Sequence, residues 1–260
     1  MPGQGAPVTN YGVVAQAASA ITPISDNAQG TGSAFRLASR GEQVAINIWN
    51  GMHSLAMEGS YWVASTATPG TGIAISVTTG TTFSDTQALI CLNNTDTLGG
   101  KTIYLDFITM VITTVPTSAT SVHLAHRVDA VNRGTAGTQL GANLVAPRPS
   151  NMNFAGTAIG QCFALGASAV SVAAASATVR NLGRNVLRSQ IPVIQDQYTI
   201  KFGAVENASS PNIGATTAQN MTFYAPPIAI GPQQSYVCNE WAVARSAATS
   251  GELIVGWVER

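Results

Sequence analysis

Apolar side chains occupy alternate positions in three stretches of the chain, 44–48, 121–128 and 194–202. This period of two is typical of a strand that buries one face and exposes the other. In the second stretch the expected core face holds Val122, Leu124, His126 and Val128. In the third it holds Ile194, Tyr198, Ile200 and Phe202. The pattern therefore predicts three half-buried strands.

Two longer runs, 102–113 and 253–258, are apolar at most positions, which favours central strands that are covered on both faces. Turn-forming clusters at 68–70 (Thr-Pro-Gly), 93–94 (Asn-Asn) and 226–227 (Pro-Pro) separate the expected strands. No amphipathic segment has the length of a three-turn helix. We therefore predict an all-β fold, in the form of an antiparallel, jelly-roll-like β-sandwich, because large antiparallel sheets hide their edges by closing in this way.

Residues 1–40 differ from the rest of the chain in being rich in Gly, Ala, Ser, Thr and Pro, with few large apolar groups. This composition predicts an extended N-terminal arm that becomes ordered against a neighbour. Residues 41–260 are predicted to form a single β-sandwich domain. An alternative division into two domains lies near 146–150, where the sequence APRPS carries two prolines.

Charged residues make up 9 % of the chain and the formal net charge is zero, against about 25 % charged residues in an ordinary soluble domain. So little surface charge protects weakly against association, which favours a protein that packs against copies of itself or a partner. The charges are unevenly placed. Residues 130–195 contain five Arg and no acid, whereas the flanking segments carry −3 and −2. Either this asymmetry steers head-to-tail contacts between subunits or the fold mixes the segments, and the sequence leaves both open.

The three cysteines, Cys91, Cys162 and Cys238, are far apart and include no C-x-x-C pair. This spacing argues against a disulfide framework or a zinc site and fits a reducing compartment. The first ten residues lack the basic and apolar regions of a secretory signal. The tract 163–179 is mostly Ala and Ser, which is too weakly apolar for a membrane span. We expect cytoplasmic synthesis and no membrane partner.

Leu98–Thr102 (LGGKT) looks like the end of a phosphate-binding loop, but Thr95 stands where the motif has its first glycine. A strand is expected to follow instead of the helix whose N-terminus would hold the phosphate. A hairpin turn is therefore the expected structure. Residues 166–170 (GASAV) likewise lack the second glycine of a nucleophile elbow.

His123 and His126, with Asp129 nearby, are the strongest metal candidates. Residues three apart on a strand point to opposite faces, so the two rings are expected to diverge. The twelve acids are scattered, and no two form a local acid/base pair, although distant carboxyl groups can meet in a fold. The sequence therefore predicts no catalytic residue, no metal and no cofactor.

Arg180, Arg184 and Arg188 are spaced four apart, which places them on one face of a strand or a helix. We predict that they make intersubunit contacts; a solvated face is the alternative. Only two lysines and a neutral total charge argue against nucleic-acid binding.

Four tryptophans and Tyr61 are candidates for a sugar-stacking platform, and core packing explains them equally well. Trp257 follows the alternation of Leu253 and Val255, which favours a place in the core. The others are Trp49, Trp62 and Trp241.

Three segments share a recognisable style. They are a long apolar strand at 101–113 (KTIYLDFITMVIT), a strand that runs into a turn at 121–140 (SVHLAHRVDAVNRGTAGTQL), and a Trp-bearing C-terminal strand within 228–260 (IAIGPQQSYVCNEWAVARSAATSGELIVGWVER). Together these segments, about a quarter of the chain, resemble virion structural proteins of tailed bacteriophages. The resemblance implies a jelly-roll or sandwich protein that decorates or cements a head, or builds tail parts. It carries no catalytic residue.

We therefore expect a non-enzymatic virion structural protein, made in the host cytoplasm, that serves as a capsid decoration, cement or minor capsid component. Its expected partners are copies of itself, as a trimer, and other capsid or tail proteins. A tail or fibre adhesin that binds host glycans is the alternative, motivated by the aromatic residues and polar amides. A third hypothesis is a carbohydrate hydrolase whose scattered carboxylates converge.

Overall fold

The computed structural model describes residues 36–37, 43–44, 51–66, 68–74, 82–115, 121–136, 144–150, 156–164, 171–187, 192–203, 218–243 and 249–260. The chain divides into two units, and the boundary falls between Gly51 and Met52. In the first unit β1 (Arg36–Leu37) pairs antiparallel with β2 (Gln43–Val44). The remainder of the predicted arm and of the predicted strand at 44–48 lies outside the described residues.

Strands dominate the second unit, so the predicted all-β fold class is confirmed. Among the described residues the only helix is the short α2 (Gly51–Met57). The strands of the second unit are β3 (Tyr61–Thr66), β4 (Ile73–Ala74), β5 (Ala88–Asn94), β6 (Ile103–Thr114), β7 (Ser121–Asp129), β8 (Gly134–Ala136), β9 (Leu144–Pro149), β10 (Gly160–Ala164), β11 (Ser171–Val172), β12 (Arg180–Val186), β13 (Gln197–Phe202), β14 (Asn220–Ala225), β15 (Ile228–Ile230), β16 (Ser235–Val243) and β17 (Ser250–Glu259).

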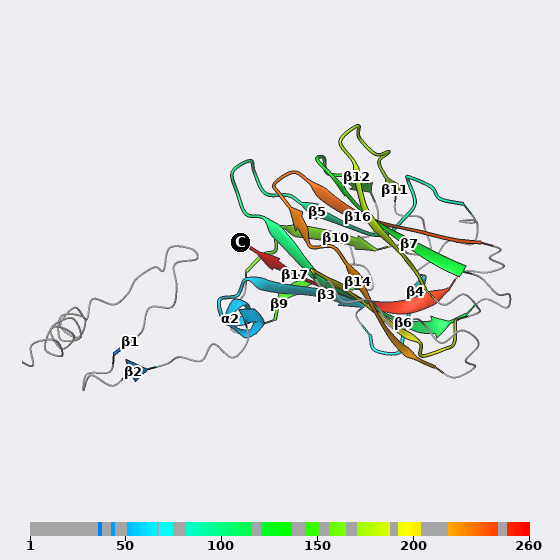
Figure 1. Ribbon diagram of the computed structural model, residues 1–260, viewed down its shortest axis with the longest axis horizontal. Coiled ribbons are helices and arrows are strands. Elements are labelled where there is room, and N and C mark those ends of the chain that lie inside the picture. Colours follow the sequence, from blue (N-terminus) through cyan, green and yellow to red (C-terminus); the bar gives the residue numbers. More distant parts are fainter. Residues whose placement is uncertain are drawn as a thin grey trace, which may run out of the picture. The chain divides into compact units, whose positions relative to one another are not determined.

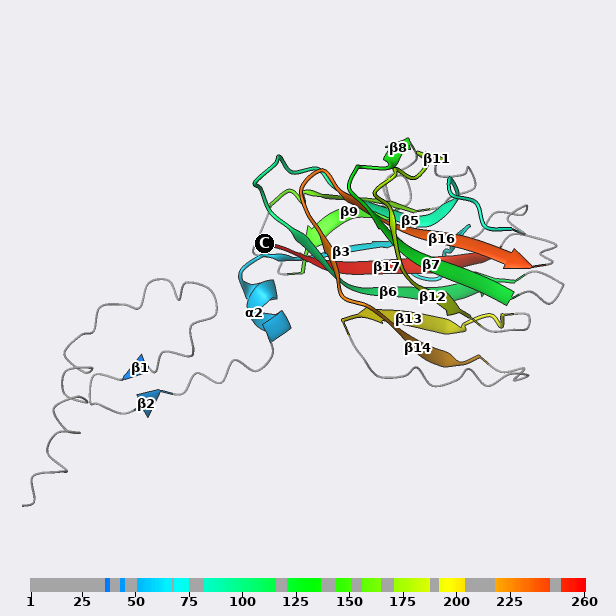
Figure 2. The same ribbon diagram turned by 45° about the horizontal axis from the view of Figure 1, so that its top comes forward.

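The strands of the second unit form two main sheets (Figure 1). The larger sheet has eight strands along the path β14-β13-β6-β17-β3-β9, with β15 paired to β6 and β4 paired to β17. Its pairings are antiparallel, except that β13 and β14 run parallel. The smaller sheet has five antiparallel strands in the order β10-β5-β16-β7-β12. Figure 2 shows β5, β16 and β7 in one layer and β17 and β6 in the next.

Strands that are distant in the sequence pair in a nested order. The pairs are β3 with β17, β5 with β16, β6 with β13, and β7 with β12, all antiparallel. Successive pairs alternate between the eight-stranded and the five-stranded sheet. The chain therefore folds back on itself between β7 and β12, and the resulting long double strand wraps across both layers.

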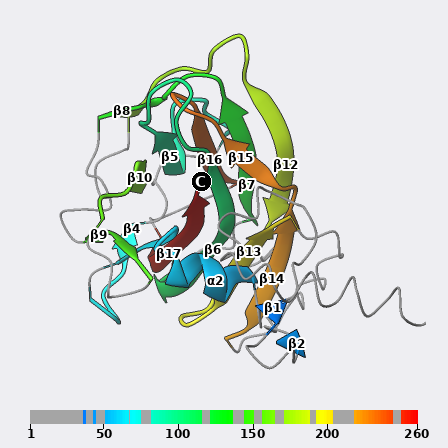
Figure 3. The same ribbon diagram turned by 90° about the vertical axis from the view of Figure 1, so that its left-hand side faces the viewer.

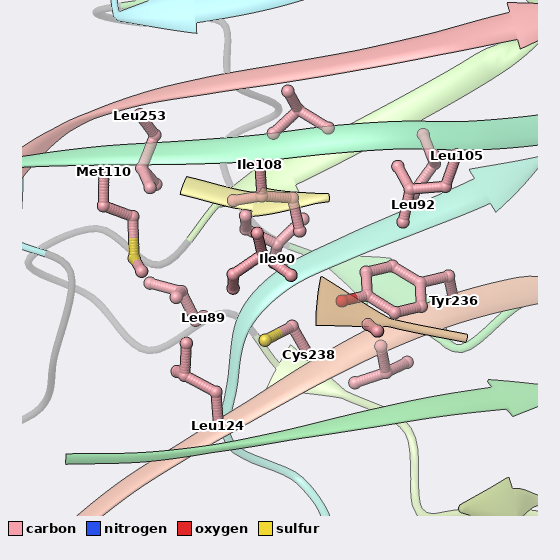
Figure 4. Close-up of a cluster of buried hydrophobic side chains, with 14 of the residues drawn as sticks. Leu89, Ile90, Leu92, Leu105, Ile108, Met110, Leu124, Tyr236, Cys238 and Leu253 are labelled. Carbon is pink, nitrogen blue, oxygen red and sulfur yellow. The ribbon is translucent and has the colours of Figure 1, made fainter. Parts of the chain in front are cut away.

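The facing sides of the two sheets share one hydrophobic core. Figure 4 shows side chains of β5, β7 and β16 pointing toward side chains of β6 and β17. The labelled residues are Leu89, Ile90, Leu92, Leu105, Ile108, Met110, Leu124, Tyr236, Cys238 and Leu253. Each of them is buried, and burial of one such aliphatic side chain contributes about 1.5–3 kcal/mol. The core between the sheets is therefore the main source of stability.

The two sheets also meet along one side, where their edge strands β12 and β14 lie next to each other (Figure 3). The amide nitrogen Nδ2 of Asn185 lies 3.5 Å from the carbonyl oxygen of Tyr224. A Cβ atom at Gly183 would lie 3.6 Å from the ring of Pro226. Each edge therefore partly covers the other, which reduces the exposure of unpaired backbone groups.

The alternating pattern predicted the direction of side chains well inside strands and poorly at their ends. In β7 the side chains of Val122, Leu124 and His126 are buried, as expected. In β13 the buried residues are Tyr198, Ile200 and Phe202. Ile194 was expected to join them but precedes β13 and is 53 % exposed. The chain turns at 193–196, where the N–H of Asp196 donates to the carbonyl of Val193, so the pattern does not extend that far.

Two of the predicted turns are confirmed and one is wrong. Residues 68–70 form a turn in which the N–H of Thr71 bonds the carbonyl of Thr68, and the two prolines at 226–227 separate β14 from β15. Asn93 and Asn94, in contrast, are buried at the end of β5. The segment 146–150, the alternative domain boundary, covers the end of β9, where Arg148 and Pro149 pair with β3.

Candidate functional site

The outer face of the five-stranded sheet carries the most conspicuous polar and aromatic groups. Because Val122, Leu124 and His126 of β7 point into the core, the alternate residues His123 and Arg127 point outward. The neighbouring strand β16 contributes Trp241, which is directly opposite His123, and Asn239. The face has two halves: one is covered by loops, and the other carries a row of rings.

The covered half is organised by four charged side chains, Asp85, Arg127, Asp129 and Arg133. Asp85 forms an ion pair with Arg127, and its other carboxylate oxygen lies 3.4 Å from Nη2 of Arg133. Nε of Arg133 lies 3.8 Å from Asp129. The side chains of Arg133 and Asp129 are fully buried, and that of Asp85 is 31 % exposed. Two acids and two bases thus neutralise each other on this half of the face.

These charged groups fasten two loop segments to the sheet. Arg133 donates from Nη2 to the carbonyl of Asp85 at 2.7 Å and from Nε to the carbonyl of Ala173 at 3.0 Å. The backbone N–H of Ser176 donates to Asp129 at 2.9 Å. The amide of Asn239 donates to the carbonyl of Gln87 at 2.8 Å. The segments 82–87 and 173–178 are therefore held by charge-assisted hydrogen bonds, which are stronger than neutral ones.

The environment of the two carboxylates keeps them ionised. Burial alone raises the pKa of Asp85, but the N–H of Ala175, the hydrogen bond from Arg127 and the charges of Arg133 and Arg127 outweigh it, so the pKa lies below its usual value. Burial also acts to raise the pKa of Asp129. The hydrogen bonds from Ser176 and Thr178 and the charge of Arg133 outweigh burial, so the pKa of Asp129 also lies below its usual value. The cluster therefore stays charged at neutral pH.

The open half carries a row of rings that crosses three elements. The rings of His123 and Trp241 stack with centroids 5.1 Å apart and an interplanar angle of 14°. Phe83 meets Trp241 at 87° with a centroid distance of 5.3 Å, and the guanidinium of Arg127 lies 5.3 Å above the Phe83 ring. Val186 of β12 stands opposite His123 and continues the row. We call the three rings of Phe83, Trp241 and His123, together with the aliphatic side chain of Val186 at their end, the ring row.

The ring row is exposed at both ends, and one of its ring nitrogens makes no hydrogen bond to a described residue. Phe83 is 46 % exposed and Val186 is 36 % exposed. Nδ1 of His123 has no hydrogen-bond partner among the described residues. Burial of the ring and then the nearby charge of Arg184 lower the pKa of His123, so the imidazole is neutral at pH 7. No acidic partner of Arg184 occurs in the part of the chain that the structure describes.

The three arginines predicted to share one face do not do so. A bulge at residue 182 adds one residue to β12, so that Arg180 pairs with Val128 while Arg184 pairs with Ala125. Because Val128 and Ala125 lie on opposite faces of β7, Arg180 and Arg184 also point to opposite faces. Both are exposed. Arg188 lies outside the described residues, and the intersubunit role of all three remains a prediction.

The fold brings part of the basic segment 130–195 together with acids of the segment before it. Arg133 is buried against Asp85 and Asp129, so it adds nothing to an external field. Arg184 is exposed on the outer face. One of the five charges of this segment is therefore neutralised inside the molecule, which favours the alternative in which the fold mixes the segments.

The histidine pair diverges as predicted. His126 is buried, with Nδ1 2.8 Å from the hydroxyl of Tyr236 and Nε2 2.7 Å from Oδ1 of Asn185. Burial lowers the pKa of His126, and the hydrogen bond with Asn185 opposes this only in part. Within the described ranges no three His, Cys, Asp or Glu side chains gather as metal ligands would.

The glycine-rich stretch at 98–102 forms a turn without the geometry of a phosphate-binding loop. Gly99 has a φ of 87°, which favours glycine, and strand β6 follows at Ile103. The carboxylate of Asp96 already accepts the N–H groups of Thr97 and Lys101, each at 2.8 Å. The turn joins β5 to β6 in different sheets, so the expected hairpin is wrong. Residues 166–170 lie outside the described ranges.

Two buried carboxylates serve as anchors for backbone. Asp196 accepts hydrogen bonds from the N–H groups of Val193 and Gln219 and from the hydroxyl of Tyr198. Glu259 accepts from the N–H groups of Ile159 and Gly160 and from Nε1 of Trp257. Each carboxylate holds a loop or a strand end in place, which is a structural role.

The aromatic residues do not form one platform. Trp62 and Trp257 are buried in the core, which confirms the interpretation favoured for Trp257. Tyr61 faces away from them and donates a 2.6 Å hydrogen bond to Asp106. Trp241 lies in the ring row on the other sheet, and Trp49 is outside the described residues. The outward-facing ring row had no signal in the sequence, because Phe83 and His123 are 40 positions apart.

All three cysteines are buried free thiols, in agreement with the expected absence of a disulfide framework. Burial raises the pKa of Cys91 and Cys238 to about 12.

No helix in the described part of the chain has the length and apolar character to cross a membrane. No protein-family model matches the chain, and neither a curated protein nor a solved structure is similar to it.

Proposed function

We propose that this chain is a non-enzymatic structural protein of a virus particle, whose second unit is a jelly-roll-like β-sandwich. The observation that carries the proposal is the nested pairing of β3 with β17, β5 with β16, β6 with β13 and β7 with β12. A double strand wrapped in this way around two layers is the arrangement of jelly rolls, which build many viral shells. Fold alone does not fix function, so the surface must agree with it.

The distribution of charge supports an assembling protein. Six of the charged side chains are buried: Arg127, Asp129, Arg133, Asp196, Glu240 and Glu259. These six charges therefore do not contribute to the surface of the described residues. Weak electrostatic repulsion between copies favours close packing in a shell. The best-fitting role is a capsid decoration, cement or minor capsid component that acts as an oligomer, with a trimer as the proposed state.

The proposal includes an arm formed by residues 1–40. Its support is the composition of that segment and the boundary that separates residues up to Gly51 from the second unit. Deletion of residues 1–40 is expected to leave the urea midpoint of the second unit unchanged and to weaken assembly. A lower midpoint would show that the segment belongs to the core.

The decisive test is the copy number of the protein in particles. Gradient-purified virions from the source culture should contain it in near-stoichiometric ratio to the major shell protein, measured by quantitative mass spectrometry. A few copies per particle would move the role to the tail. Absence from particles would contradict the proposal.

A tail adhesin that binds host glycans is the second candidate, and the exposed ring of Phe83 beside the half-buried ring of Trp241 favours it. Glycan-array binding that is lost in Trp241→Ala and kept in Trp62→Ala would support this role, provided that both variants fold. Lack of binding to any glycan or host cell would exclude it.

A further inference from the structure

We infer that the ring row and Arg184 of one copy dock onto the outer face of the eight-stranded sheet of the next copy, around Asp106 and Glu252. The contact is head-to-tail: two different surfaces of the same chain meet. This inference rests on the proposed function, because it supplies the contact through which copies assemble.

The donor surface is apolar in the middle and basic at its margin. Phe83, Trp241 and Val186 expose apolar surface on one half of the five-stranded sheet. Arg184 lies on β12, two strands from Trp241 on β16 and on the same outer face, and has no acidic partner among the described residues. A partner that brings a carboxylate next to apolar side chains would pair with Arg184 and cover this apolar surface.

The outer face of the eight-stranded sheet has that composition. Leu253 and Val255 of β17 point into the core, so Glu252 and Ile254 point outward. Glu252 and Ile254 are half-buried, and so is Phe107 of the neighbouring strand β6. Phe107 lies over Gly256, where a Cβ atom would be 2.4 Å from the ring. An apolar strip therefore crosses β6 and β17 on this side.

Carboxylates flank the strip at both ends. Asp106 accepts the hydroxyl of Tyr61 through Oδ2, and Glu252 accepts the N–H of Gly70 through Oε1. Neither forms an ion pair with any described residue. A carboxylate oxygen accepts more than one hydrogen bond, so each acid retains capacity for a guanidinium. Lys201, on the next strand, is exposed on this face.

Charge complementarity selects a second copy as the occupant. The described charges of the outer five-stranded face cancel, except for that of Arg184. On the outer face of the eight-stranded sheet Asp106 and Glu252 form no ion pair with a described residue, although Lys201 and Arg148, which stands opposite Val63, are also placed on that face. Identical faces would bring Arg184 against Arg184, which like-charge repulsion disfavours. A head-to-tail contact brings opposite charges together and propagates into closed rings or extended arrays, as a shell requires.

The test uses the full chain and two variants that each disable one side of the contact. Arg184→Glu reverses the charge of the donor surface. The double variant Asp106→Asn/Glu252→Gln removes both negative charges but keeps an oxygen that accepts from Tyr61 and from the N–H of Gly70. Arg180→Glu is the matched control, because the bulge in β12 places Arg180 on the other face. Urea melts of each variant show whether it is folded.

Sedimentation velocity over a concentration series is expected to show self-association of the wild type. Arg184→Glu and the double variant should each weaken it by at least about tenfold, and Arg180→Glu should behave as the wild type. An equimolar mixture of Arg184→Glu with the double variant should form dimers and nothing larger, because one intact side from each variant remains. Higher salt should weaken every one of these contacts.

The outcomes separate the contact from the proposed function. If the wild type associates and both variants associate equally well, the contact is wrong while a role in the particle stands. If the wild type is monomeric yet abundant in virions, its assembly depends on another protein, and the contact is again wrong. A monomeric protein that is also absent from virions would overturn both. If each variant associates weakly alone and their equimolar mixture forms no dimers, the contact is likewise overturned.

Discussion

Arg, Trp and His each occur in two contrasting settings in this molecule. Arg133, Trp257 and His126 are buried and have hydrogen-bond partners. Arg184, Trp241 and His123 lie together on the outer face of the five-stranded sheet, and Arg184 has no ion-pair partner among the described residues. The comparison shows that the buried member of each pair stabilises the interior through its hydrogen bonds. The members left on the open half of the face are the ones available for contacts with another molecule.

The arginine pair should give the largest difference. Arg133→Met leaves Asp85 and Asp129 without their shared base and the carbonyl of Ala173 without a donor. Removing one partner of a buried ion pair costs about 3–5 kcal/mol, so we expect the free energy of unfolding in urea to fall by that amount. Arg184→Met, the matched control, should change it by at most about 0.5 kcal/mol. Equal effects would mean that Arg133 is not an anchor of the two loops.

The tryptophan pair should give the next largest difference. Trp257→Ala removes a fully buried ring and the donor to Glu259, and such a truncation costs about 3–5 kcal/mol. Trp241→Ala loses the contacts with His123 and Phe83 on a partly exposed surface, for which about 1–2 kcal/mol is expected. Urea unfolding followed by far-UV circular dichroism measures both. A near-neutral Trp257→Ala would place that ring outside the core.

Sequence patterns succeeded where one interaction dominates. Period-two alternation located β7 and the buried face of β13, because burial of alternate apolar side chains decides strand register. The apolar runs located β6 and β17 in the middle of the larger sheet. The settings of Trp257 and of the two histidines also followed from alternation alone.

Sequence patterns failed where a polar residue finds its hydrogen-bond or ion-pair partner far away in the sequence. Asn93 and Asn94 have the composition of a turn but end β5, because their amides bond the backbone of Gly134, Lys101 and Ile230. Arg133 has no nearby acid in the sequence except Asp129, and Asp85 reaches it only through the fold. The bulge in β12 shifted Arg184 to the other face without any signal in the residue spacing.

The histidine pair should separate through the pH dependence of stability. Burial lowers the pKa of His126 in the folded state, whereas the unfolded chain binds the proton with the ordinary pKa near 6.5. The unfolded state therefore takes up more protons as the pH falls below about 6.5, and the free energy of unfolding should decrease until the pH reaches the folded-state pKa. Urea titrations between pH 7.5 and pH 5 should show this decrease, about the range in which histidine ionises.

Variants of each histidine show which ring causes the decrease in the free energy of unfolding at low pH. His126→Gln is expected to be destabilised at every pH by about 1–3 kcal/mol, because the groups of Tyr236 and Asn185 lose their partner. It should also have a flatter pH dependence than the wild type. His123→Gln should retain most of the wild-type slope, since that ring is only partly buried. A wild-type slope in His126→Gln would assign the effect to another group.

The smallest effect concerns the charge next to the ring row. Arg184 is one cause of the low pKa of His123, after burial of the ring. Removing its positive charge makes the imidazolium easier to form, so Arg184→Met should raise the pKa of His123 without changing stability by more than about 0.5 kcal/mol. The histidine ring protons, followed by NMR from pH 8 to pH 5, about the range of imidazole titration, report this directly. Arg180→Met is the control: four positions away in sequence but on the opposite face of β12, it should leave the pKa of His123 unchanged. If both variants raise it equally, the bulge does not separate the two arginines, and the donor surface proposed for assembly would have to include Arg180.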